Sequence, residues 1–168
     1  MATVMQLLNA KTDASVHTID VGASVYDAIA LMSRHGIGAL IVTEGSAVRG
    51  IVTERDYARK VVLKERSSKS TYVSEIMSRA LRYVRPRQTA DECMTLMNQY
   101  RIRHLPVIDG GQLVGMVSIG DLVKNLIDEQ QFAIEQLERY VSGGSHDPGA
   151  STLTRRASLP DAFATALS

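Results

Sequence analysis

Apolar and polar residues follow the same order twice along this chain. Over residues 25–32 and 90–97, apolar side chains recur at i, i+3, i+4 and i+7, the spacing that gives a helix one buried face. Each stretch is followed by a continuous apolar run, at 39–42 and 105–108, which is typical of a buried strand. The pattern therefore predicts a helix and then a strand in each half of the chain.

Further elements complete each half. A short helix is expected at 4–8 and at 73–77, followed by a leading strand at 18–21 and at 82–86. A second strand is expected at 48–53 and at 113–118, and a final helix at 54–63 and at 119–127. Glycine-containing turns separate the two strands of each predicted hairpin. The predicted order is β-α-β-β-α in both halves, a mixed α/β (α+β) fold.

The two halves align as an internal repeat. Residues 19–56 lie on 84–121 without a gap when the sequence is shifted by 65 positions, and nine positions are identical, among them Gly50/Gly115. A unit of this size leaves one apolar face uncovered, so we expect the two copies to pack as a pseudo-two-fold pair. The predicted first module, with the N-terminal helix, covers residues 1–72, and the second module covers 73–128. A C-terminal helix is expected at 129–141, and a disordered Gly/Ser-rich tail at 142–168.

The start of each long helix carries a capping signal. Ser24 is followed three residues later by Asp27, and Thr89 by Glu92, which is the spacing of a capping box. The only cysteine, Cys93, belongs to the apolar stripe of the second helix, so we expect it to be an unreactive core residue.

Composition narrows the class of protein. With 45% hydrophobic and 22% charged residues the chain is globular, and a net charge of +1 does not favour nucleic acid or a membrane surface as partner. A single cysteine fits a reducing compartment. The N-terminus lacks the pattern of a signal peptide, and no apolar run is long enough to span a bilayer, so we expect a cytoplasmic protein.

One polar motif recurs where the second strand meets the final helix. It is Thr53-x-x-Asp56 in the first copy and Ser118-x-x-Asp121 in the second. Such a pair can simply cap the helix. At the start of a helix it can also bind a ligand, because free N–H groups and the helix dipole attract phosphate, and a carboxylate can accept hydrogen bonds from a ribose diol. Both functions can coexist.

A second group of residues breaks the repeat symmetry. Arg101, Arg103 and His104 precede a strand in the second copy, where the first copy has Gly36, Gly38 and Ala39. A cleft between the copies would be small and neutral on one side and cationic on the other, which suits an anionic ligand.

The two motifs also differ from each other in charge. Arg55 precedes Asp56, whereas Gly120 precedes Asp121, so we predict two unequal sites.

This arrangement resembles the CBS-domain pair, named for cystathionine β-synthase. The resemblance is carried by Val73–Met77, Tyr100–Asp109, Gly50–Asp56 and Gly115–Asp121, and it covers roughly residues 4–128. It implies a regulatory, non-enzymatic protein that binds AMP, ATP or NAD as a ligand, forms a homodimer and signals to an unknown protein effector.

The resemblance also implies roles for individual residues. Asp56 and Asp121 would hold ribose, and Thr53 and Ser118 would approach phosphate. In the rest of the implied site, Arg103 and His104 would approach phosphate, Gly38 and Ala39 would line the opposite wall, and Ile51 and Met116 would pack against adenine. Val21 is a further expected ligand-binding residue, and Arg55 is either an additional cation of the first site or an exposed helix residue.

Two alternatives remain open. One is a ligand-free structural or interaction dimer in which the motifs only cap helices. The other is a nucleic-acid binder that uses the basic run Arg79–Arg87, although a solvated edge is the main interpretation of that run. No catalytic motif is visible, and His17 and His35 lack a partner at metal-ligand spacing, so we expect neither an enzyme nor a zinc site.

Overall fold

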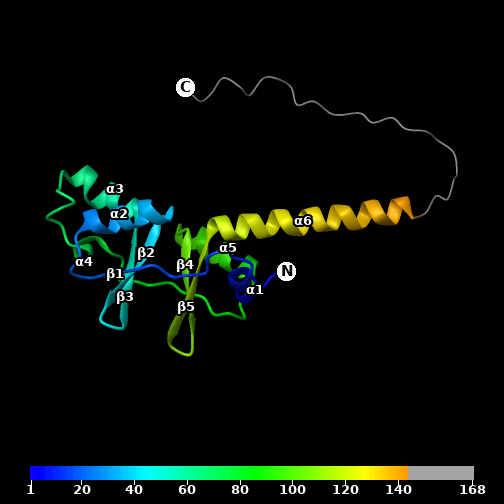
Figure 1. Cartoon of the computed structure of the whole chain (residues 1–168), viewed down its shortest axis with the longest axis horizontal. Helices are drawn as coiled ribbons and strands as arrows, with labels where there is room; N and C mark the ends of the chain where they lie inside the picture. Colours follow the sequence, from blue (N-terminus) through cyan, green and yellow to red (C-terminus); the bar gives the residue numbers. More distant parts are fainter. Residues whose placement is uncertain (144–168) are drawn as a thin grey trace, which may run out of the picture. The chain divides into compact units, whose positions relative to one another are not determined.

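The computed structural model describes residues 1–143, and residues Met1–Gln130 form one compact unit (Figure 1). The predicted disordered tail therefore lies, from residue 144 onward, outside the described residues. In chain order the elements are α1 (Val4–Asn9), β1 (Thr18–Asp20), α2 (Val25–His35), β2 (Ala39–Glu44), β3 (Ala47–Thr53), α3 (Glu54–Lys60), the 3-10 helix η1 (Val62–Lys64), α4 (Val73–Ile76), α5 (Ala90–Tyr100), β4 (His104–Asp109), β5 (Gln112–Ser118) and α6 (Ile119–Ser142).

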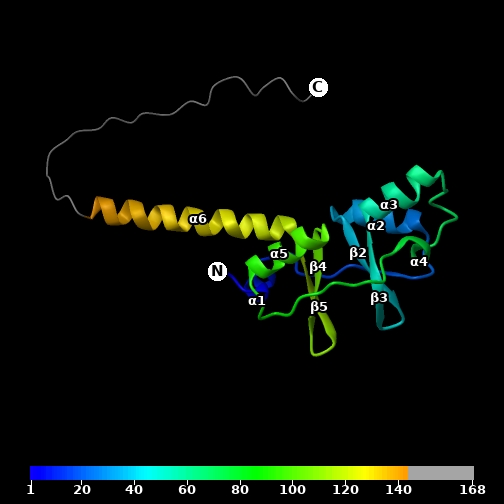
Figure 2. The ribbon, with the colours of Figure 1, turned by 180° about the vertical axis from the view of Figure 1, so that it is seen from behind.

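The strands form one hairpin in each half. β2 pairs antiparallel with β3, and β4 with β5, and each hairpin has a register shift at the same place in the repeat, after Val42 and after Val107. In the first half, β1 adds a parallel edge strand, with Thr18 opposite Ile41. Seen from either side, the two hairpins lie next to each other (Figures 1 and 2). The mixed α+β fold is confirmed.

The leading strand predicted at 82–86 is reduced to a single bridge between Val84 and Val107. Val84 makes the two hydrogen bonds expected of a strand residue, to Pro106 and Ile108. Pro86 has no N–H to continue the ladder, and its carbonyl oxygen accepts instead from the N–H of Met5, at 3.0 Å. The segment is thus diverted toward α1 after one bridge.

The predicted helix starts are confirmed. The Ser24 hydroxyl accepts from the backbone N–H of Asp27, and Thr89 forms a full capping box with Glu92. The two helices end differently, because the left-handed residue is Gly36 after α2 but Arg101, with φ of 53°, after α5.

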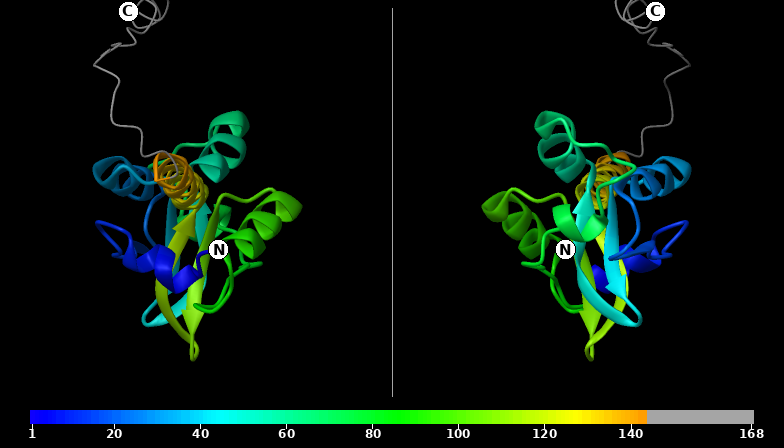
Figure 3. Two further views of the ribbon diagram at one scale, coloured as in Figure 1. Left: turned by 90° about the vertical axis from the view of Figure 1, so that its right-hand side faces the viewer. Right: turned by 90° about the vertical axis from the view of Figure 1, so that its left-hand side faces the viewer.

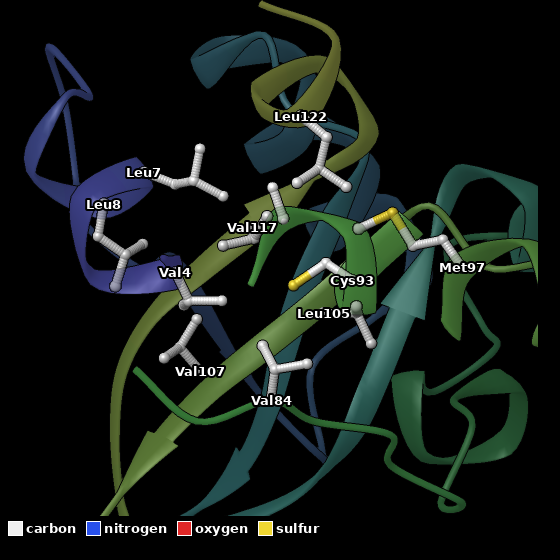
Figure 4. Packing of buried hydrophobic residues seen from close by; sticks show 11 residues of the cluster. Val4, Leu7, Leu8, Val84, Cys93, Met97, Leu105, Val107, Val117 and Leu122 are labelled. Carbon is white, nitrogen blue, oxygen red and sulfur yellow. The ribbon is translucent and has the colours of Figure 1, made fainter. Parts of the chain in front are cut away.

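The two short helices are exchanged between the modules. α1 packs its three buried apolar residues into the core of the second module, against Cys93 and the β4–β5 hairpin (Figure 4). α4 packs Val73 and Ile76 into the core of the first module. The backbone pairing is equally symmetric, with isolated bridges from Thr3 to Thr89 and from Ser24 to Tyr72. A division of the sequence at residues 72 and 73 therefore does not divide the two cores.

The identical glycines of the repeat give room for this exchange. A methyl group on Gly50 would stand 2.3 Å from the carbonyl oxygen of Ser78, just after α4. A methyl group on Gly115 would stand 2.7 Å from the Leu8 side chain in α1. Only glycine lets the exchanged segment approach each hairpin this closely.

Candidate functional site

A cleft of about 370 Å³ opens between the two modules, and we call it the inner cleft. It is lined by Gly38, Ile51, Thr53, Glu54, Arg55, Asp56, Arg59, Lys60, Ser78, Ala80, Arg82, Arg101, Ile102, Arg103 and His104. Seven of the twelve residues predicted from the sequence are among them: Gly38, Ile51, Thr53, Arg55, Asp56, Arg103 and His104. Residues from both halves of the repeat therefore meet here.

The end of β3 and the start of α3 fix the carboxylate in this cleft. Asp56 Oδ2 accepts from the Thr53 backbone N–H and hydroxyl, both at 3.0 Å, and Thr53 Oγ1 accepts from the Asp56 N–H at 3.2 Å. Asp56 Oδ1 lies 2.9 Å from Lys60 Nζ, one helical turn later. The motif thus caps α3. A carboxylate has about four acceptor positions, and three are used here, so Asp56 keeps room for one further donor.

The lining of the inner cleft is strongly cationic. Two of its residues are acidic, Glu54 and Asp56, and six carry a positive charge: Arg55, Arg59, Lys60, Arg82, Arg101 and Arg103. These charges lie close together in a partly enclosed space, where water screens them less than on an open surface. The cleft is therefore built to attract an anion.

Two of these cations are held in place by their neighbours. Arg55 Nη1 donates to the carbonyl oxygen of Arg101 at 2.8 Å. The guanidinium carbon of Arg82 lies 4.0 Å from the centre of the Tyr100 ring, a cation–π contact. The sequence suggested a solvated edge for Arg82, yet the structure places this residue in the cleft. Arg59 was missed, although it follows Asp56 by three residues and so shares its helix face.

Gly38 and His104 meet across the module boundary. A methyl group on Gly38 would lie 3.5 Å from His104 Cε1, which is ordinary contact. Burial lowers the pKa of His104; the carboxylate of Asp121 opposes this shift, while the positive charges of Lys11 and Arg103 add to it. The imidazole is held toward its neutral form, and an entering anion would favour its protonation.

The second copy of the motif forms the same cap with a different lysine. Asp121 Oδ2 accepts from the Ser118 N–H at 2.7 Å and from its hydroxyl at 2.9 Å. Lys11 Nζ, from the segment after α1, lies 3.0 Å from Asp121 Oδ2 and donates to the Met116 carbonyl at 2.8 Å. The position that matches Lys60 is Asn125. The two carboxylates are therefore neutralised from different parts of the chain.

The cavity beside Asp121 has a different character from the inner cleft. It has a volume of about 340 Å³ and is lined by Leu7, Ala10, Lys11, Thr12, Asp13, Asp121, Lys124, Asn125 and Asp128. Three aspartates and two lysines leave no excess of positive charge. Of the predicted residues only Asp121 lines it, while Ser118, which is hydrogen-bonded to Asp121, does not.

The remaining predicted residues line neither cavity. Ala39 is buried in β2, with 5% of its surface exposed, and Val21 packs against the core of the first module. Met116 and Ser118 lie on β5, where both are partly buried.

The sequence profile of the CBS domain matches this chain twice, at residues 11–63 and 73–128. The chain belongs to the CBS-domain family. A mitochondrial CBS domain-containing protein of Arabidopsis thaliana, CBSX3, is 44% identical over 126 residues, which is 72% of this chain and 61% of that protein. The matched CBS pair thus spans less than two thirds of the plant relative.

Solved structures of CBS proteins have the same fold. A Burkholderia ambifaria protein described as a signal-transduction protein with CBS domains is 59% identical, with a TM-score of 0.75, covering 77% of this chain and 96% of that one. A cyanobacterial CBS-CP12 protein, described as hexameric, is 32% identical with a TM-score of 0.64, covering 73% and 70%. The predicted resemblance to a tandem CBS-domain pair is confirmed.

Two other features of this CBS pair bear on its chemistry. Within residues 1–143, no three His, Cys, Asp or Glu side chains are grouped to hold a metal ion, and the rings of His17 and His35 stack with centres 3.9 Å apart. No helix in this part of the chain is long and apolar enough to cross a membrane.

Proposed function

We propose that this CBS pair is a regulatory protein that binds an adenine nucleotide in the inner cleft and signals by contact with a protein effector. The observation that carries the proposal is the meeting of Asp56, in the first turn of α3, with six cations in one cleft between the modules. A ribose bears a diol for the carboxylate, and phosphates supply the negative charge that the cations lack. Ile51, which is partly buried, offers an apolar surface for the adenine ring.

Binding would act on the relative position of the modules. Gly38 and Thr53 come from the first module and Arg103 and His104 from the second, so a ligand that contacts both walls favours one setting of the cleft over others. Only such a difference in affinity allows a ligand to shift a conformational equilibrium.

A single high-affinity site is the expected stoichiometry. The cavity at Asp121 has no excess of cations and holds only one of the predicted residues. Lys11 Nζ lies 3.0 Å from the Asp121 carboxylate.

Isothermal titration calorimetry with AMP, ATP and NAD tests the proposal. Asp56→Asn keeps a side chain able to cap the helix but removes the charge, and we expect it to weaken binding at least about tenfold, which is about 1.4 kcal/mol. Asp121→Asn is the matched control, and it should leave affinity at the inner cleft within about twofold. Absence of binding by the wild-type protein for every adenine nucleotide would refute the proposal and favour the ligand-free dimer.

The alternatives make distinct predictions. Nucleic-acid binding through Arg79–Arg87 would require a gel shift that survives raised salt, although Arg82 is already engaged at the cleft.

Self-association is also part of the proposal, since the similar CBS-CP12 protein is described as hexameric. We expect a homodimer by light scattering. Location in the cytoplasm stays a prediction from the sequence.

A further inference from the structure

The last helix, α6, is much longer than the helix that matches it in the first half of the chain. It is a single helix of 24 residues, seen end-on in yellow and orange in Figure 3. Its counterpart α3 has seven residues, and residues 65–72, which match 130–137, form no helix. The second half of α6 is therefore an addition to the repeated fold.

One face of α6 carries an exposed apolar stripe. Its residues are spaced alternately by four and three positions, and we call them the α6 seam: Val123, Ile127, Gln130, Ile134, Leu137 and Val141. The five apolar side chains of the seam are between 48% and 73% exposed. The one polar residue among these six is Gln130, which is uncharged. Proteins rarely leave a continuous apolar face of this kind uncovered, so we expect a partner on the seam.

The spacing of the seam indicates that this partner is another helix. Alternating steps of four and three residues are the heptad repeat of a coiled coil. In heptad notation the a positions are Ile127, Ile134 and Val141, and Leu137 is at a d position. Branched side chains at a with leucine at d favour two parallel helices over larger bundles.

Gln130 indicates that the partner is an identical chain in parallel orientation. In a parallel pair in register, each seam residue meets its own copy, so the two Gln130 amides can hydrogen-bond to each other. In an antiparallel pair a d residue meets an a residue of the partner, and every a position of the seam is Ile or Val. The amide would then be buried without a partner, which costs free energy.

The residues that flank the seam are compatible with this pairing. In a parallel pair, position g of one helix lies beside position e of the next heptad in the other. Leu126 would meet Gln131 of the second copy, and Ala133 would meet Glu138 of the second copy. These pairs bring no like charges together.

We infer that two copies of this chain associate through the α6 seam as a parallel two-stranded coiled coil. The inference assigns a surface and an orientation to the expected homodimer. It is independent of the proposed nucleotide site, because no seam residue lines the inner cleft.

A charge placed in the seam tests the surface. By symmetry Ile134→Asp buries two facing carboxylates, so it should raise the dissociation constant of the dimer at least about a hundredfold. Phe132→Asp is the matched control, because Phe132 is 63% exposed and lies two residues from Ile134, on the opposite face of the helix. It should change the constant by no more than about twofold. Sedimentation equilibrium of the full chain measures both, and circular dichroism checks that both variants fold.

A cysteine in the seam tests the orientation. Leu137→Cys should form a disulfide between subunits under mild oxidation, because a parallel pair brings the two copies of position 137 side by side. Arg139→Cys, on the outer face of α6, should form none. The natural Cys93 is fully buried and is common to both variants. In an antiparallel pair the two copies of position 137 would lie too far apart to be bridged.

The outcomes separate this inference from the proposed function. A dimer that Ile134→Asp leaves intact uses another surface, and a dimer that Ile134→Asp and Phe132→Asp weaken equally does not depend on the seam; either result overturns the inference. Absence of a disulfide in Leu137→Cys, or a monomeric wild-type protein, overturns it as well. Calorimetry with AMP should give Ile134→Asp the same affinity as the wild-type protein. If no nucleotide binds to either, the proposed function is wrong while the coiled coil stands.

Discussion

Replacement of Gly50 by alanine is expected to destabilise the protein far more than the same change at Gly115, although the two glycines match in the repeat. A methyl group on Gly50 would meet the Ser78 carbonyl oxygen at 2.3 Å, whereas one on Gly115 would meet the methyl carbons of Leu8 at 2.7 Å. The first neighbour is backbone, held by paired hydrogen bonds between Ile51 and Ser78. The second is the end of a side chain, which can change rotamer.

The magnitude follows from what must move. To admit the Gly50→Ala methyl group, the segment at Ser78 has to leave β3. Two backbone hydrogen bonds, of 3.0 and 2.8 Å, are then lost, at about 1 kcal/mol each, and overpacking adds about 1–3 kcal/mol. We expect the free energy of unfolding to fall by about 3–5 kcal/mol. For Gly115→Ala, where only Leu8 has to repack, we expect a fall of about 1 kcal/mol.

Urea denaturation followed by circular dichroism measures both losses on the same scale. Ile51 and Ser78 also line the inner cleft, so Gly50→Ala should weaken nucleotide binding while Gly115→Ala should not. Equal loss of stability in the two variants, or a larger loss for Gly115→Ala, would refute the explanation based on backbone contact.

Two further predictions concern titratable side chains. Burial, with a smaller contribution from Glu92, raises the pKa of the Cys93 thiol to about 11, so a thiol reagent at about pH 8 should label it only when the chain unfolds, and rapid labelling of the native protein would contradict the packing. The pKa of His104 lies below its ordinary value of 6.5, and a bound phosphate would raise it, so binding takes up a proton and should tighten as the pH falls from about 8 to about 6. His104→Gln should remove this dependence in calorimetric titrations. Because the unfolded chain binds this proton more readily than the free folded protein, the free protein should lose stability as the pH falls below 6.5.

The repeat and its apolar periodicity were sufficient to predict the buried faces of the two long helices. The apolar stripes at 25–32 and 90–97 depend only on local helix geometry, and their strongest positions are buried in the structure. The failure at 82–86 also has a local cause, since Pro86 interrupts the ladder and its carbonyl turns to α1. The proline is visible in the sequence, but the sequence does not show that the Met5 N–H donates to its carbonyl oxygen.

Non-local geometry accounts for what the sequence could not predict. The helices at 4–8 and 73–77 carry the same apolar spacing, so nothing in the pattern says which core each one enters. In the sequence, nothing distinguishes Arg82 from a solvent-exposed charged residue at the edge of a sheet. Only the contact with the Tyr100 ring and the fold of the second module bring it to the inner cleft. The Asp56 motif could be predicted because both copies contain it. Residues that occur in one copy only, such as Arg59, have no such repetition to mark them as part of a site.

The exchange of α1 and α4 has a consequence for how two unequal cavities can arise. Neither half of the chain holds a complete core, because each half supplies the helix that fills the other. A single half would be complete only when paired with an identical copy of itself, and symmetry would then make both of its clefts alike. Joining two halves in one polypeptide removes that constraint. His104 can then face Gly38 on one side, while the other side keeps a cavity that no arginine lines.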